Sequence, residues 1–535
     1  MRRSSSTRFS FLIVALLGAG CAVTPDNATV HRRASEVSAD ATTTPTVAET
    51  TDDLKPLSPR VTPVTYQTET SEQTETAQGD QIPVAAQHEA GTGLDLRKVI
   101  DSVHESYPLL QAAMFSRNIA LGETISASGQ FDLKLKGASE NGPTGYYQTY
   151  RQSLGLQQPL YGGGEVFAGY RVGRGDFQPW YLERQTNDGG ELKAGLSVPL
   201  MQNVDIDQRR ADLWNAQYGR SLAEPEIRAQ RIGFVQEASY AYWNWVAAGE
   251  NYQIARRVLQ LAEERTERIR SQVTAGLIDP PELTDNLRLV ADRKAKLADS
   301  ERKWNQTATK LSLFLRDSAG NPWIPPSDQL PTFPEIDAAS QTEISHDITQ
   351  ALSTRPELEA LDWQRKQIDV DYSQARNQLL PTLDAVIAGS QDVGQPTSSK
   401  RDKSEFELEA ALLLDVPVQR RKARGKLTAL EGKVAQLQAK RRMVADKITV
   451  DVRNARIAME AALIQVYQTS EAVRMAEELA ERERVNQQEG HSDLLKVTLR
   501  EQYAAESATK AVEAKLTYFE AEADRRAAMG LDRLQ

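Results

Sequence analysis

The sequence has very little of what metal-binding, thiol-dependent or phosphate-binding proteins need. Only one of the 535 residues is cysteine, Cys21, so paired cysteines are absent. No phosphate-binding loop or nucleophile elbow is present, and five histidines are scattered without the spacing of metal ligands: His31, His88, His104, His346 and His491. We therefore expect no enzyme, no cofactor and no metal site.

The chain also lacks an excess of positive charge and long apolar runs. Lysine and arginine number 64 against 74 aspartate and glutamate residues, which gives a formal net charge of -10. A general nucleic-acid binder needs a basic surface for the phosphates, so we expect that this protein is not one. No stretch of eighteen apolar residues exists, which argues against a membrane-spanning helix.

The first twenty residues have the layout of a secretory signal peptide, because arginines precede the apolar run 11–17 and the small residues 18–20. Cys21 follows directly, and it resembles the lipid-modified cysteine of a bacterial lipobox. Gly18 stands where such motifs usually carry leucine. The alternative is an ordinary signal peptide with an incidental cysteine. A lipidated Cys21 would anchor the mature chain to the periplasmic leaflet of the outer membrane.

Residues 21–93 are rich in Thr, Ser, Pro, Glu and Gln and contain almost no aromatic side chains. Such a segment cannot bury enough apolar surface to offset the entropy of ordering it. We expect a disordered, lipid-anchored tether, followed from Leu94 to Ser128 by helical periodicity with a break at Pro108.

Proline is missing from the whole stretch 419–535. Apolar residues recur there mostly at spacings of three and four, which predicts a long helix over 419–489 and a returning helix over 493–529. Some seventy helical residues would span roughly 100 Å. A second seam, Val450, Ile457 and Ile464, steps by sevens beside the first, so we expect neighbours on both sides of this helix.

The first half carries a matching pair of helices, over 205–275 and 282–315. Pro225 is expected to kink or interrupt the first of them early. This helix also holds an aromatic cluster, Tyr240, Tyr242, Trp243 and Trp245. Packing between helices is the favoured role of the cluster, and a cofactor or sugar platform is the alternative. The proline-rich segment 317–345 reads as an irregular connector.

Period-two alternation of apolar and polar residues predicts four strands, at 131–139, 191–199, 382–389 and 405–416. They form two pairs inserted between helices, and pairs pooled from several chains could close into a barrel with an apolar outside and a wet inside. The alternative is an amphipathic sheet over a soluble core. Strand-like pieces at 153–160 and 165–171 either add a hairpin to the barrel or form an ordered extracellular insertion.

The chain reads as an internal duplication, with repeats at 94–316 and 346–535. A shift of 248 residues aligns Tyr107-Pro108-Leu109-Leu110 with Arg355-Pro356-Glu357-Leu358, and a shift of 214 aligns Gly276 with Gly490. The shift falls because the strand-bearing insert of the first half is longer. Each half therefore contains a short helical segment, strands, a long helix, a turn and a returning helix.

This arrangement resembles the TolC-type outer-membrane efflux protein family. The residues that carry the resemblance are the helix-to-strand junctions Gln130-Phe131 and Leu380-Pro381, the strand exits Val198-Pro199-Leu200 and Val416-Pro417-Val418, Ala241-Tyr242-Trp243, and the turns at Gly276 and Gly490. The resemblance implies a homotrimer with a shared β-barrel in the outer membrane and a long α-helical tunnel in the periplasm. With Cys21, the chain resembles the lipoprotein members of this family.

The resemblance further implies a passive duct of a tripartite efflux or type I secretion system, energised by an inner-membrane pump through a periplasmic adaptor. The hairpin turns are the expected adaptor contacts and gate, with these candidate residues: Gly276, Asp279, Glu282, Asp285, Glu489, Gly490 and Asp493. Helix capping and solvation are the alternative role of the acidic ones. The competing function is a periplasmic coiled-coil adaptor or an envelope-spanning structural lipoprotein. The exported substrate does not follow from the sequence.

Overall fold

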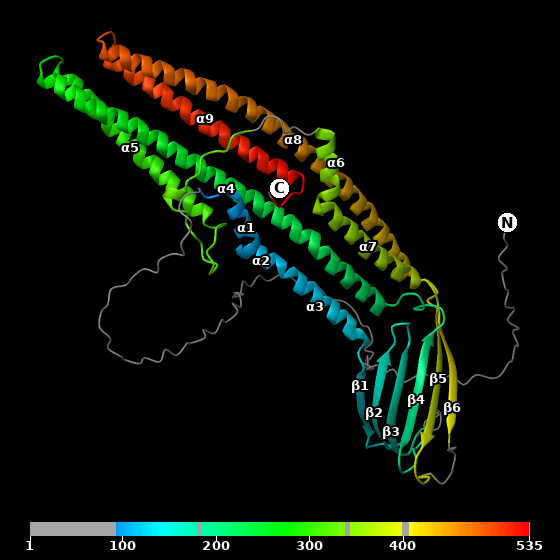
Figure 1. Cartoon of the computed structure of the whole chain (residues 1–535). Helices are drawn as coiled ribbons and strands as arrows, with labels where there is room; N and C mark the ends of the chain where they lie inside the picture. The colour runs from blue at the N-terminus through cyan, green and yellow to red at the C-terminus, as the bar shows by residue number, and fades with distance from the viewer. Residues whose placement is uncertain (1–92, 179–183, 337–342, 399–405, 534–535) are drawn as a thin grey trace, which may run out of the picture. The chain divides into compact units, whose positions relative to one another are not determined.

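The computed structural model describes residues 93–178, 184–336, 343–398 and 406–533. The predicted signal peptide, Cys21 and nearly all of the predicted tether lie outside these residues. The described part is mainly helical with one antiparallel sheet, as the sequence predicted (Figure 1). Its α-helices are α1 (Leu96–Ser106), α2 (Pro108–Met114), α3 (Ser116–Ser128), α4 (Gln208–Thr274), α5 (Pro280–Leu311), α6 (Ile344–Thr354), α7 (Pro356–Asn377), α8 (Arg421–Gln488) and α9 (Leu494–Ala528).

The segment before the first strand is helical, and its breaks have local causes. Asp95 caps α1 by accepting a hydrogen bond from the Arg97 amide at 3.1 Å. Pro108 occupies the first turn of α2, where its missing N–H costs nothing, so the predicted break at this residue is confirmed. The same arrangement recurs at Pro356, the first residue of α7.

Two long hairpins make up most of the described chain. Helix α4 packs along α5, and α8 packs along α9. Pro225 was expected to kink or interrupt the first long helix. Helix α4 continues through this residue, so the interruption is wrong, whereas a kink stays a prediction. A proline removes only one hydrogen bond of the ladder, and here the ring is buried while the adjacent Glu224 pairs with Arg117 of α3 at 2.6 Å. Helix α4 thus passes through Pro225 where it packs along α3.

The sheet has six described strands, and they pair antiparallel in sequence order. They are β1 (Lys134–Gly142), β2 (Thr149–Pro159), β3 (Glu165–Gly175), β4 (Glu191–Pro199), β5 (Thr382–Asp392) and β6 (Glu407–Asp415). The four predicted strands correspond to β1, β4, β5 and β6. The strand-like pieces at 153–160 and 165–171 lie in β2 and β3, which form a hairpin inside this sheet between β1 and β4. The pairing of β4 with β5 joins the two halves of the chain.

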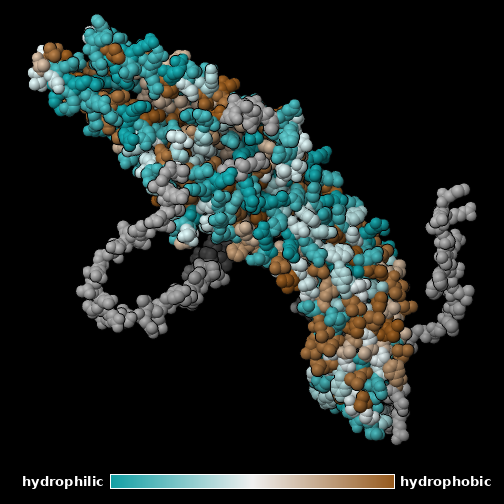
Figure 2. All heavy atoms as spheres, viewed as in Figure 1, coloured by the Kyte–Doolittle hydropathy of each residue, from teal (hydrophilic) through white to brown (hydrophobic). Residues whose placement is uncertain are grey.

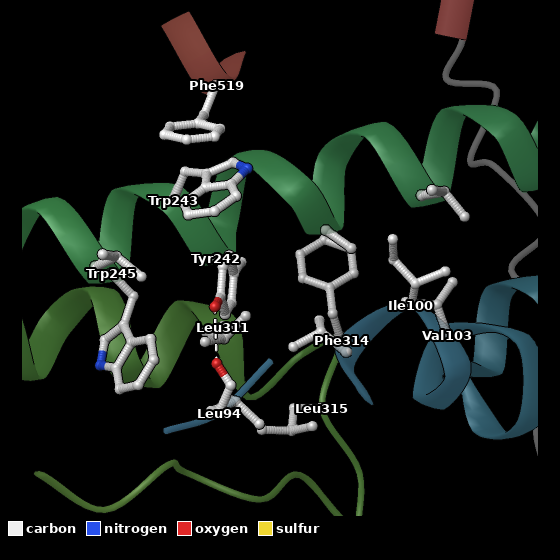
Figure 3. Close-up of a cluster of buried hydrophobic side chains, with 14 of the residues drawn as sticks. Leu94, Ile100, Val103, Tyr242, Trp243, Trp245, Leu311, Phe314, Leu315 and Phe519 are labelled. Carbon is white, nitrogen blue, oxygen red and sulfur yellow. Dashed lines mark hydrogen bonds between the residues drawn. The ribbon is translucent and has the colours of Figure 1, made fainter. Parts of the chain in front are cut away.

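The main core lies where α1, α4, α5 and α9 meet, and the aromatic cluster of α4 fills it (Figure 3). Trp243 stacks on Phe519 of α9 with ring centroids 4.2 Å apart. The Tyr242 hydroxyl donates a 2.7 Å hydrogen bond to the carbonyl of Leu94, and Trp245 is completely covered. The predicted packing role of the cluster is confirmed. Tyr240, at its edge, donates a hydrogen bond to Asp524.

Candidate functional site

The register of the sheet collects its apolar side chains on one face. Leu135 lies opposite Leu156, and the same row continues through Ala168, Ala194 and Leu408. Most large apolar residues of this face are exposed, for example Leu135 at 68% and Leu412 at 70% of their surface. Others on this face are Leu154, Val166, Tyr170, Leu192, Leu196, Ile387 and Leu414. A continuous apolar face of this extent marks contact with a membrane or another protein.

The opposite face carries every charged residue of the six strands except Arg174. Three ion pairs tie this face together. Arg171 bonds Glu191 through its Nε at 2.6 Å, and the ammonium of Lys193 lies 2.7 Å from Glu409. Arg184, in the segment before β4, lies 2.8 Å from Glu407 of β6. The second pair links β4 of the first half to β6 of the second.

Solvent exposure along the central strands is the reverse of that in an ordinary one-sided sheet. In β3 and β4 the apolar-face residues Ala168, Tyr170, Leu192 and Ala194 are exposed, whereas polar-face residues are half-buried or buried. A sheet on a soluble core buries its apolar side chains and leaves the polar ones in water. Figure 2 shows apolar residues gathered over the strands and hydrophilic residues over the long helices. The sheet is therefore built for apolar surroundings.

A polar junction fixes the sheet to the helices. Asp207 caps α4 by accepting a 2.9 Å hydrogen bond from the Arg210 amide. The Arg210 side chain is buried and donates to the carbonyl of Val204 at 2.8 Å. From α7, the Asn377 amide donates to the carbonyl of Ile206 at 2.7 Å, and its oxygen accepts from Asn203 N–H at 3.0 Å. Backbone groups that leave the sheet are thus satisfied by side chains of both halves.

The two turns predicted as hairpin tips have the same backbone conformation. Gly276 has φ of 72° and Gly490 has φ of 78°, in the left-handed region that glycine enters without penalty. Each glycine follows the end of a long helix, α4 or α8 respectively. The sequence alignment of these two positions is therefore matched by their geometry.

The acidic candidates at the turns are all exposed: Asp279, Glu282, Asp285, Glu489 and Asp493. Asp493 caps α9 by accepting a 2.8 Å hydrogen bond from the Lys496 amide, and this bond is the largest cause that lowers the pKa of its carboxyl group. Asp279 is the N-cap residue of α5 but makes no capping hydrogen bond through its side chain. Capping, the alternative role, therefore holds for Asp493. An acidic ring needs several copies and stays a prediction.

A buried charge cluster near the turns joins all four long helices. Glu501 of α9 is 3% exposed and pairs with Arg265 of α4, with Arg293 of α5 at 3.2 Å, and with Arg484 of α8 at 3.2 Å. Arg265 lies eleven residues before Gly276, and Glu501 lies eleven residues after Gly490. Both turns therefore lie at the same end, each roughly 16 Å beyond this ion pair at the rise of an α-helix.

Sequence reasoning missed this cluster, although a signal was present. Arg265 follows Ala262 by three residues and precedes Ile269 by four, so an arginine interrupts the apolar seam of α4. Burial raises the pKa of the Glu501 carboxyl group, but the guanidinium groups of Arg265, Arg293 and Arg484 outweigh it and bring the pKa below its ordinary value. Glu501 is thus an anion at neutral pH.

None of the helices in the described residues combines the length and the apolar character required to cross a membrane. Nor does this part of the chain bring three or more histidine, cysteine or acidic side chains together in a group that could hold a metal ion.

Comparisons with known proteins identify the fold. Neither a family model nor a curated protein sequence matches the chain. Among solved structures, a membrane protein from Pseudomonas aeruginosa is 16% identical, with a TM-score of 0.58 over 85% of this chain and 99% of that one. The open state of the MtrE outer membrane channel from Neisseria gonorrhoeae is 18% identical, with a TM-score of 0.56 over 85% and 98%.

A third similar structure is CusC, whose study concerns folding and transmembrane channel formation. It is 14% identical, with a TM-score of 0.58 over 84% of this chain and 96% of its own. At such low identity the likeness speaks for the fold, and it extends across nearly the whole of each solved chain. The described chain thus has the fold of the TolC-type outer-membrane channels, the family that its sequence resembles.

Proposed function

We propose that this protein is the outer-membrane channel of a tripartite efflux or type I secretion system, a passive duct for export across the periplasm and the outer membrane. Three copies would share a β-barrel in the membrane, and their long helices would form an α-helical tunnel in the periplasm. The observation that carries the proposal is the exposure pattern of the sheet: its apolar face is exposed, and its polar face is held together by ion pairs. Lipid would cover the first face, and the second would line a water-filled lumen.

The long helices support the tunnel. Helix α4 has 67 residues and α8 has 68, so each spans roughly 100 Å at the rise of an α-helix. In α8 the first predicted seam is buried or half-buried against its own chain, for example at Ile448 and Val452. The second seam is exposed at 50% for Val450, 62% for Ile457 and 63% for Ile464. A neighbouring copy would cover this stripe, as in a homotrimer.

The hairpin tips would lie at the inner end of the tunnel, where a periplasmic adaptor and an inner-membrane pump would engage them. We assign this contact and the gate to the turns, with Gly276, Asp279, Glu282 and Asp285 in one hairpin. The other hairpin contributes Glu489, Gly490 and Asp493. Lipidation of Cys21 would tether the chain to the outer membrane. The duct would need no cofactor, bind no nucleic acid and catalyse no reaction. The inner-membrane pump would supply the transport energy.

The alternative is a periplasmic coiled-coil adaptor or an envelope-spanning structural lipoprotein. Either would also have long helices and a lipid anchor. Its strands would have to fold into a soluble structure with the apolar side chains inside, and the exposed apolar face favours the channel. Outer-membrane fractions that contain a heat-modifiable trimer, and ion conductance of the purified full chain in planar bilayers, would support the duct. A soluble monomer without conductance would refute it.

Two adjacent residues of β6 sharpen this experiment. Leu412 points to the apolar face, whereas Leu413 lies opposite Asp384 on the polar face. An arginine on a lipid-facing strand costs about 2–4 kcal/mol at the membrane midplane, and every copy bears this cost. We expect Leu412→Arg to reduce the trimer recovered from the outer membrane strongly, and Leu413→Arg to leave the trimer and alter conductance. Equal recovery of the two variants would contradict a lipid-facing side.

A further inference from the structure

The β2–β3 hairpin is an integral part of the sheet. Its turn lies against the beginning of α4, where the Trp214 indole donates to the Tyr161 hydroxyl at 3.0 Å and Arg209 donates to the carbonyl of Gly164 at 3.3 Å. Gly164 has φ of 76°, and a side chain there would collide with the Ser197 carbonyl. The turn therefore belongs to the helix end of the strands, which is opposite to the place of an extracellular insertion.

The sheet ends in two open edges of equal length. Strands β1 and β6 have nine residues each, and each pairs with a single neighbour within the described residues. Unpaired backbone groups at the edge of a membrane sheet are costly, since lipid offers no hydrogen bonds. Because the six strands are antiparallel in sequence order, with four strands between the two edges, β1 and β6 run in opposite directions. A rotated copy can therefore place its β1 beside β6 with antiparallel pairing.

The side chains of the two edges complement each other. On the polar face, β1 begins with Lys134 and Lys136, which make no ion pair within the described residues, and β6 ends with Asp415. Complete antiparallel overlap of the two strands would put Lys134 opposite Asp415 and Leu135 opposite Leu414. Polar and apolar faces then continue unbroken from one copy to the next. A slip of one residue would exchange the faces.

The nearest alternative register with matched faces gives the same contact. A slip of two residues can put Lys136 opposite Asp415, so a lysine meets this carboxylate in both cases. The fully overlapped register also sets Glu140 opposite Glu409. The carboxylate of Glu409 already pairs with Lys193 of its own chain at 2.7 Å, which reduces the repulsion.

We propose that β1 of each copy pairs with β6 of the next copy through a seam in which Lys134 or Lys136 meets Asp415, so that each copy gives six strands to the barrel. This rests on the proposed trimeric channel and makes its barrel eighteen-stranded. The two strand pairs expected from the sequence would have given four strands per copy. Barrel diameter grows with strand number, and eighteen strands enclose an aqueous channel. The lumen therefore admits wider cargo than a barrel built from two pairs per copy.

Disulfide cross-linking of the full chain in the membrane tests the seam. Within one copy, five strand spacings of about 4.8 Å separate β1 from β6, or roughly 24 Å, which no disulfide can bridge. We expect the double variant Lys134→Cys with Asp415→Cys, or Lys136→Cys with Asp415→Cys, to yield covalent dimers and trimers on oxidation. Each single variant should yield none. Cross-linking of a Lys134→Cys single variant would show like edges pairing and would overturn the seam.

The outcomes separate the seam from the channel itself. A trimer that conducts ions but forms no cross-link with either cysteine pair would overturn the seam and leave the channel function standing. Absence of both trimer and conductance in the parent protein would refute the channel function. Charge reversal gives a second readout: Asp415→Lys should lower the temperature at which the trimer dissociates in detergent, and adding Lys134→Asp should raise it again. No recovery in the double reversal would count against the pairing.

Discussion

Glutamine in place of Glu501 is the sharpest test of how the hairpin tips are held. The substitution keeps the shape of the side chain and removes the carboxylate that Arg265 and Arg293 share. Both arginines are almost fully buried, and because a guanidinium group stays protonated even there, the variant leaves two buried charges without their counter-ion. Breaking a buried ion pair in this way costs about 3–5 kcal/mol. The loss of the pair with Arg484 contributes less to this cost, because the Arg484 side chain is 26% exposed and water screens its charge.

Hydrogen exchange of the amides in α9 near Glu501 measures this loss locally. Every 1.4 kcal/mol is a factor of ten in an equilibrium constant, so opening of the tips should become about a hundredfold or more easier. The matched control is Glu506→Gln, five residues further along α9, because that carboxylate is exposed and accepts a 2.8 Å hydrogen bond from the nearby Gln502. Equal exchange in the two variants would refute the reasoning.

The pH dependence of the same contact has a definite sign. The folded pKa of Glu501 is lowered, so its stabilisation is fully present above the unfolded value of about 4.3 and is lost as pH falls through the folded value. After correction for the intrinsic rates of exchange, the amides of the tips should keep their protection between pH 5 and 8, because this range lies above the unfolded pKa of about 4.3. They should loosen only below about pH 4, and Glu501→Gln should remove this acid transition.

Three further predictions concern the core, a turn and the anchor. Trp243→Ala should lower the free energy of unfolding by about 3–5 kcal/mol, measured as a fall in melting temperature, because the ring is buried between α4 and α9. Gly490→Ala should destabilise the turn by about 1–2 kcal/mol and Gly490→Asn by less, seen as faster exchange at 486–494, because only glycine and asparagine accept this φ readily. Cys21→Ser should abolish acyl labelling; continued labelling would refute the lipid anchor.

Much of the fold could be predicted from local pattern. Helical periodicity placed the long helices within a few residues of α4, α5, α8 and α9, because seams of apolar residues and glycine turns act over short sequence distances. Period-two alternation placed four strands in the same way. The interruption expected at Pro225 was wrong, because α4 is continuous there and packs along α3. The sequence left the place of β2 and β3 open, because their pairing partners lie elsewhere in the chain.

The sequence by itself determined the two repeats, the long hairpins, their glycine turns and the two-sided character of the strands, all of which follow from residues near one another in the chain. Only the tertiary structure decided that six strands share one sheet with a single charged face, since register depends on distant segments. It alone brought Arg265 and Glu501 together, 236 residues apart, and so placed both tips at one end. Buried ion pairs carry no local signature beyond a charge in an apolar seam.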